Sequence, residues 1–192
     1  MSNSYALHCT EGDLTRVATI LPGRRYTAEG PLLYHARAAL RGLGWTVRVV
    51  EWTAPPSLDT ARESATRVLD GPDAPDDATT HLVVAKSLGT VAMPLAAKLQ
   101  LPGVWLTPLL TVADAPEIRG AATGLAEDHL MIGGGADPTW DHDFVAGLGT
   151  DYVEVADANH ALEVPDDWRR NLETVEDLTA EIEYFAASFD AR

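Results

Sequence analysis

The chain has 192 residues, of which 46% are hydrophobic, and a formal net charge of -15 at pH 7 from Lys+Arg 14 and Asp+Glu 29. This length predicts one domain over residues 1–192, and the hydrophobic fraction excludes disorder of the whole chain. Because the negative charge would repel phosphates over most of the surface, we expect no nucleic-acid partner.

The sequence carries no sign of export or of a membrane segment. Cys9 is the only cysteine, so no disulfide can form within the chain. Residues 1–16 lack the basic and apolar regions of a secretory signal, and no apolar run approaches the ~20 residues that span a bilayer. We therefore expect a cytoplasmic protein that does not bind membranes.

Apolar strands and amphipathic helices alternate along the chain. In the first half the pattern predicts a strand at 15–23, a helix at 31–44, a strand at 45–52 and a helix at 57–70. A serine precedes the second helix as an N-cap, and the Pro- and Asp-rich stretch 69–80 after it predicts a surface loop. The elements predicted in the second half are, in order, strand 79–87, helix 89–100, strands 103–108 and 129–137, helix 141–148, strand 151–157 and helix 167–189.

This alternation predicts an α/β fold, with a mostly parallel central sheet and helices on both faces. The carboxyl ends of parallel strands share one edge of such a sheet, and ligands bind there. The residues that follow each strand are therefore the first candidates for a functional site.

One of these strand ends carries a candidate nucleophile. The strand at 79–87 leads into Ala85-Lys86-Ser87-Leu88-Gly89, which is the G-x-S-x-G nucleophile elbow with alanine in place of the first glycine. Small residues two positions either side of Ser87 leave room for the sharp turn. An ordinary strand-to-helix turn explains the pentapeptide equally well when it is taken alone.

Two further strand ends complete a pattern. Asp137 lies at the end of the strand predicted at 129–137, and His160 lies in the loop after the strand at 151–157. Ser87, Asp137 and His160 thus occur at one predicted sheet edge in the chain order of α/β-hydrolases. Asp157 and Asp143 are the other acids that could orient the histidine.

On the stretches ATILPGRRY, VVAKSLGT, LMIGGGADPTWD and VEVADANHALEVP, the chain resembles the α/β-hydrolase superfamily, in particular its small members without a cap domain. Residues 109–128 can supply only a short helix or lid. The resemblance implies a serine hydrolase for small ester, thioester or related acyl substrates. Ser87 would be the nucleophile, His160 the general base and then acid, and Asp137 the group that holds the imidazole.

An oxyanion hole would accompany this triad. One donor is expected from the backbone N–H of Leu88, directly after the nucleophile, and the second from the loop after the strand at 15–23. In that loop Arg24 follows Pro22-Gly23, a departure from the familiar His-Gly start. We expect the N–H of Arg24 to be the second donor.

Basic and aromatic side chains near this site are candidates for substrate binding, namely Lys86, Arg25 and Tyr26. The basic side chains, with that of Arg24, either turn to solvent and pair with carboxylates or form a positive pocket for an anionic substrate. No spacing fits a zinc site or a dinucleotide fingerprint, so we expect neither a metal nor a cofactor. The sequence assigns no oligomeric state.

The competing interpretation is a hydrolase-fold protein that binds a ligand or a protein without turnover. Ala85 and the unusual PGRRY loop are departures that could accompany lost activity. A fluorophosphonate probe separates the two interpretations, because it labels only an activated serine.

Overall fold

A seven-stranded sheet forms the centre of the fold, in the strand order β1-β3-β2-β4-β5-β6-β7. The computed structural model describes residues 4–125 and 127–191. The strands are β1 (Tyr5–Thr10), β2 (Asp13–Leu21), β3 (Trp45–Trp52), β4 (Thr80–Lys86), β5 (Gly103–Leu106), β6 (His129–Gly134) and β7 (Asp151–Val155). Strand β1 is antiparallel to β3, whereas all other neighbouring pairs are parallel. The predicted mostly parallel sheet is confirmed, and the carboxyl ends of β2 to β7 share one edge.

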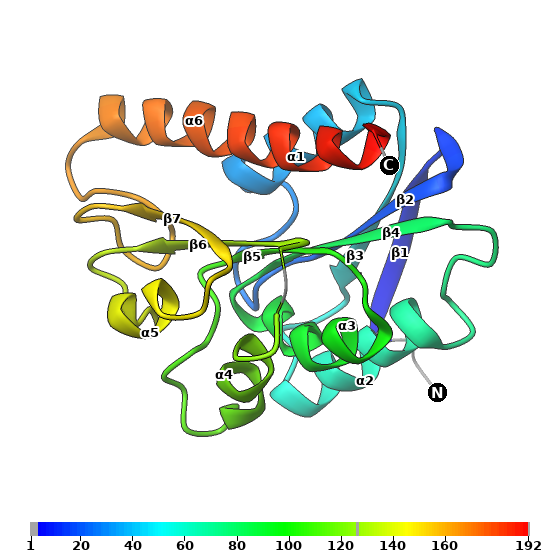
Figure 1. Ribbon diagram of the computed structural model, residues 1–192, viewed down its shortest axis with the longest axis horizontal. Coiled ribbons are helices and arrows are strands. Elements are labelled where there is room, and N and C mark those ends of the chain that lie inside the picture. The colour runs from blue at the N-terminus through cyan, green and yellow to red at the C-terminus, as the bar shows by residue number, and fades with distance from the viewer. Residues whose placement is uncertain (1–3, 126, 192) are drawn as a thin grey trace.

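Helices cover both faces of the sheet (Figure 1). On one face lie α1 (Pro31–Gly42) and α6 (Trp168–Ala187). On the other lie α2 (Leu58–Asp70), α3 (Met93–Leu99), α4 (Pro116–Ala122) and α5 (His142–Ala146). Two 3-10 turns, η1 (Ser87–Ala92) and η2 (Ser188–Ala191), complete the elements of the described residues.

Strand β4 is buried on both faces, which explains its continuous apolar run. Leu82 and Val84 pack in the core under α1 and α6, while Val83 and Ala85 pack in the core under α2 and α3. All four side chains are fully buried. Because successive side chains of a strand point to opposite faces, a strand between two helical layers has no polar face.

The predicted starts of helices α1, α2 and α5 are confirmed to within one residue. Pro31 occupies the first turn of α1, where its missing N–H costs no hydrogen bond. The side chain of Ser57 accepts a hydrogen bond from the Thr60 N–H at 3.1 Å, and so caps α2. Asp141 caps α5 in the same way, through the N–H of Phe144 at 3.1 Å. The Asp-rich stretch between α2 and β4 is a loop, as expected.

Apart from shifts of one to three residues at the ends of elements, the structure differs from the predicted elements in two places. Strand β1 was not predicted, because a partly exposed edge strand lacks an apolar run. The helix predicted at 89–100 is instead the 3-10 turn η1 followed by α3. Pro94 lies in the first turn of α3 and has no N–H to continue a helix begun earlier, so the α-helix starts beside it.

The connection between β5 and β6 is short, as predicted. Within its described residues, 107–125 and 127–128, the only helix is α4. Across the parts of the chain that the structure describes, no helix is both long enough and apolar enough to cross a bilayer.

Candidate active site

Ser87 stands on a strained turn directly after β4. Its backbone φ is 51°, in the left-handed region that non-glycine residues rarely adopt. A Cβ added to Gly89 would lie 2.1 Å from the carbonyl oxygen of Leu21, so only glycine lets the chain turn so close to β2. These features are those of a nucleophile elbow, and they lift the Ser87 hydroxyl out of the sheet edge.

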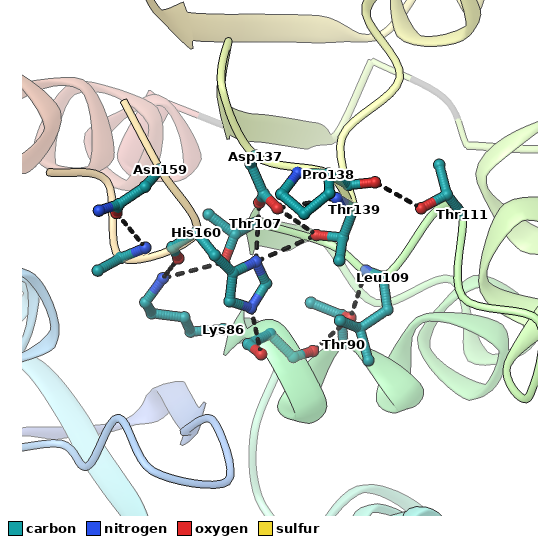
Figure 2. Close-up of polar contacts among 12 residues, drawn as sticks. Lys86, Thr90, Thr107, Leu109, Thr111, Asp137, Pro138, Thr139, Asn159 and His160 are labelled. Carbon is teal, nitrogen blue, oxygen red and sulfur yellow. Dashed lines mark hydrogen bonds and ion pairs between the residues drawn. The ribbon is translucent and has the colours of Figure 1, made fainter. Parts of the chain in front are cut away.

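The three predicted triad residues lie in one chain of contacts. Figure 2 shows the part of it that joins His160 to Asp137. His160 Nε2 is 2.7 Å from Ser87 Oγ. On the other side of the ring, His160 Nδ1 is 2.8 Å from Asp137 Oδ2. The loops after β4, β6 and β7 thus bring together side chains that are far apart in the sequence.

Asp137 is the buried member of this chain of contacts. It is 4% exposed, and its Oδ1 accepts hydrogen bonds from the N–H and the hydroxyl of Thr139 at 2.8 and 2.9 Å. Burial acts to raise the pKa of Asp137, but the hydrogen bonds from His160 and Thr139 outweigh it and leave this pKa below its usual value. The carboxylate is therefore ionised at neutral pH and attracts a proton to the facing nitrogen of His160.

Thr139 fixes which nitrogen of His160 carries the proton. Its hydroxyl donates to Asp137, so at 3.1 Å its oxygen faces His160 Nδ1 as an acceptor. With two acceptors around Nδ1, the proton sits on that nitrogen, and Nε2 is free to accept from Ser87. Thr139 was not predicted as a site residue. The Asp-Pro-Thr sequence could have indicated it, because an aspartate often forms a turn in which its carboxylate accepts a hydrogen bond from the backbone N–H two residues later.

The other two acids considered for this role lie elsewhere. The Asp157 side chain is 79% exposed and pairs with Arg170 at 3.5 Å. Asp143 is exposed in the first turn of α5. Asp137 is therefore the acid that contacts His160.

Lys86, directly before Ser87, is buried under the site with 1% exposure. Its ammonium donates to Thr107 Oγ1 at 2.9 Å and to the backbone carbonyl of His160 at 3.0 Å, and it lies 4.7 Å from the centroid of the Tyr26 ring. Figure 2 shows this side chain reaching toward the His160 backbone and Thr107. Burial lowers the pKa of Lys86 to about 8, while Asp137 and Glu163 act in the opposite direction. This ammonium therefore joins β4, β5 and the His160 loop.

The loop after β2 reaches the nucleophile through Gly23. A Cβ added there would lie 3.3 Å from the Cβ of Ser87, so the backbone of this loop passes directly beside the serine. Arg24 follows Gly23 directly and is exposed, whereas Leu88, which follows Ser87, is 4% exposed. The backbone N–H groups of Arg24 and Leu88 stay the predicted donors of an oxyanion hole.

An open cleft of about 720 Å³ surrounds Ser87 and His160. Its ten lining residues are Gly23, Arg24, Arg25, Tyr26, Lys86, Ser87, Pro138, Asn159, His160 and Ala161. The cleft therefore includes six of the eight residues predicted from the sequence, while Asp137 and Leu88 are buried and do not line it. Within the described residues, no group of three or more His, Cys, Asp or Glu side chains could hold a metal ion.

The fold of the chain can be identified by comparison with known proteins. No family model and no curated protein matches the sequence. In structure the chain is similar to Est1E from Butyrivibrio proteoclasticus with ferulic acid bound, at a TM-score of 0.70 and 14% identity over 98% of this chain and 96% of that one. It is also similar to XC6422 from Xanthomonas campestris, a serine hydrolase without a lid, at a TM-score of 0.63 and 18% identity over 98% and 96% of the two chains. The chain has the α/β-hydrolase fold.

A third α/β-hydrolase fold structure agrees with this assignment, the α-β serine hydrolase homologue from Coxiella burnetii. Its TM-score is 0.64 at 12% identity, over 91% of this chain and 90% of that one. The expected α/β-hydrolase fold is confirmed across almost the whole chain. Because one fold hosts many activities, the activity has to be argued from the site itself.

Proposed function

We propose that the chain is a serine hydrolase that cleaves small esters, thioesters or related acyl bonds. The observation that carries the proposal is the continuous contact from Ser87 Oγ through His160 to the buried Asp137 carboxylate. The elbow at Ser87 and the open cleft above it are further support, because a nucleophile has to be both exposed and fixed.

In the proposed mechanism, Ser87 Oγ attacks the carbonyl carbon of the substrate while His160 Nε2 takes the hydroxyl proton. The negative charge that develops on the carbonyl oxygen is stabilised by the backbone N–H groups of Leu88 and Arg24. His160 then protonates the leaving alcohol or thiol, and an acyl-enzyme remains. Water attacks this ester after giving a proton to His160, which returns it to Ser87 as the acid product leaves.

Asp137 has an electrostatic and an orienting role in both halves of this cycle. It keeps the proton of neutral His160 on Nδ1, and it stabilises the imidazolium that forms when Nε2 accepts a proton. Thr139 holds the second carboxylate oxygen, so the carboxylate cannot rotate away from the ring.

Two structural neighbours support the substrate class. Est1E has ferulic acid bound. Another similar structure is the Pyrococcus furiosus esterase Pf2001, at a TM-score of 0.64 and 10% identity over 96% of this chain and 92% of that one. We extend ester cleavage to this chain because its own serine, histidine and aspartate have the geometry for it.

Hydrolysis of p-nitrophenyl esters of graded chain length, with thioesters and small peptides alongside, tests the proposal. We expect wild type to cleave esters or thioesters, and Ser87→Ala to lower kcat by about 10⁴-fold or more. The matched control is Ser188→Ala, an exposed serine in η2, which should retain wild-type kcat. If the folded wild type cleaves none of these substrates, the alternative of a binding module without turnover is favoured.

A further inference from the structure

The active cleft has a charge opposite to that of the whole protein. The chain has a net charge of -15, with 29 acidic side chains. Yet none of the described residues that line the cleft is acidic, while Arg24, Arg25 and Lys86 are basic. Because a cleft lined by one sign of charge concentrates ligands of the other sign, this local reversal favours an anionic ligand.

Arg24 and Arg25 are free to bind such a ligand. Both are exposed, and among the contacts of the described residues neither has an ion pair or a side-chain hydrogen bond. Four other arginines pair with carboxylates at 2.6 to 2.9 Å, namely Arg37, Arg62, Arg67 and Arg119. Arg41 and Arg169 also lack an ion pair among the described contacts, but only Arg24 and Arg25 of these four line the cleft around Ser87.

The ammonium of Lys86, in contrast, is not free to bind an anion. Its ammonium is buried and directed to Thr107 Oγ1 and to the carbonyl of His160. It contributes positive charge beneath the cleft, but its donors are engaged within the protein. Direct contact with an anion therefore falls to Arg24 and Arg25.

A second cavity shares Arg24 with the cleft. It measures about 650 Å³ and lies between the loop after β2 and the end of β3. Its lining is mixed, because Glu29, Glu51 and Arg37 line it together with apolar side chains such as Trp52. The absence of acidic lining residues is therefore a property of the cleft around Ser87 and not of this second cavity.

We infer that the natural substrate is an ester or thioester that carries a carboxylate or phosphate group, which binds Arg24 and Arg25 while Ser87 attacks the acyl carbon. This inference rests on the proposed hydrolase function. Arginine suits the role, since its planar guanidinium donates two parallel hydrogen bonds to either kind of anion. Hydrolysis itself proceeds as above, because the anion takes no part in bond making or breaking.

The test compares esters that differ only in one charge. On the acyl side, mono-p-nitrophenyl adipate is compared with p-nitrophenyl hexanoate, and the spontaneous rate is subtracted. Adipate is chosen because the carboxylate of a shorter diacid attacks its own ester efficiently. On the leaving-group side, 4-carboxyphenyl hexanoate is compared with its methyl ester.

We expect wild type to prefer the anionic partner of at least one pair by about tenfold or more in kcat/KM. Arg24→Gln/Arg25→Gln should abolish that preference, whereas Arg24→Lys/Arg25→Lys should retain part of it. Using the ratio within a pair cancels any common change in kcat, and the backbone N–H of Arg24 is kept in every variant. Raising the ionic strength from about 0.05 to about 0.5 M should weaken the preference, because salt screens exposed charges.

The matched control is Arg41→Gln, which removes the same charge at the exposed end of α1, next to the amino-terminal end of β3. It should leave both ratios unchanged. Equal kcat/KM for charged and neutral esters in wild type, or a preference that survives in the double glutamine variant, would overturn the inference while leaving the hydrolase proposal intact. Failure of the proposed function has a different signature, since wild type would then cleave neither member of either pair.

Discussion

The buried ammonium of Lys86 donates a hydrogen bond to the backbone carbonyl of His160 at 3.0 Å, so the residue before the proposed nucleophile holds the loop that carries its proposed base. The same ammonium reaches Thr107, which has a left-handed backbone with φ 44° at the end of β5. One side chain thus fixes the relative positions of three segments that meet at the site. These segments come from different strands. The backbones of β4 and β5 are paired directly at Lys86 and Leu106, and the Lys86 ammonium adds a contact from this pair to the loop after β7.

Replacing Lys86 by Met should therefore remove the hydrogen bond that holds the His160 loop without leaving a cavity in place of the buried side chain. We expect kcat for a neutral ester to fall by about tenfold, because a small displacement of a catalytic group has a large effect on rate. KM should change less, since the lining of the cleft is retained. Steady-state kinetics, with circular dichroism to verify folding, measure both.

Lys98→Met is the control for this substitution, because Lys98 is exposed in the last turn of α3. It should match wild type in kcat and KM. A folded Lys86→Met protein with wild-type kcat would show that Lys86 does not position His160.

Asp137→Asn tests whether Asp137, and not Asp157 or Asp143, is the acid that orients His160. The amide cannot hold His160 in the tautomer that accepts from Ser87, so we expect a folded protein whose kcat falls by about 10⁴-fold. Asp157→Asn and Asp143→Asn should have near-normal kcat, because both side chains are exposed and Asp157 pairs with Arg170. A larger loss in either of these controls than in Asp137→Asn would assign the acid elsewhere.

Gly89→Ala tests the close approach that the elbow requires. The new Cβ would meet the backbone of Leu21 at 2.1 Å, where no flexible side chain can move aside. We expect the free energy of unfolding to fall by about 2 kcal/mol or more, measured by urea denaturation.

Gly120→Ala is the matched substitution for this experiment. Gly120 lies within α4 and a Cβ there meets nothing within 4 Å. Alanine should stabilise the protein by about 0.5–1 kcal/mol, because it is the better helix former. Equal effects at the two glycines would contradict the assigned elbow geometry.

Two buried histidines should make stability depend on pH. Burial lowers the pKa of His81 to about 4, and Arg48 acts in the same direction. Burial also lowers the pKa of His129 to about 4, against the effect of Asp128. His129 Nδ1 accepts a hydrogen bond from Trp105 Nε1 at 3.2 Å, which requires the neutral ring.

Between pH 6.5 and about 4 the unfolded chain binds protons at both histidines and the native state does not. Their stabilising contribution is therefore complete above pH 6.5 and declines as the pH falls, by about 1.4 kcal/mol per pH unit for each histidine. Urea denaturation from pH 7 to pH 5 measures this slope. His81→Gln should reduce it, whereas His35→Gln, at an exposed position on α1, should not.

The sequence was sufficient for the parallel strands β2 to β7 and for the three residues of the proposed triad. Ser87, Asp137 and His160 each lie after one of these strands, and parallel strands bring such residues to one edge whatever the details of packing. The strand that precedes Ser87 could also be predicted as buried, because the run from Leu82 to Ala85 is apolar without interruption.

The contacts around the triad could not be predicted in this way. Lys86 was interpreted as a possible substrate-binding residue, but its burial depends on partners at Thr107 and at His160, 74 residues away. The position of Thr139 above His160 depends equally on where the loop after β7 returns. Strand β1 escaped prediction because an exposed edge strand needs no apolar run.

The most direct test of the central proposal is the mass of the intact protein after treatment with a fluorophosphonate, followed by peptide mapping of the adduct. We predict one covalent adduct on Ser87 in the folded wild type, absent from Ser87→Ala, retained in Ser188→Ala and formed much more slowly in His160→Ala. A folded wild-type protein that stays unlabelled, or an adduct at another residue, would contradict the assignment of Ser87 as an activated nucleophile.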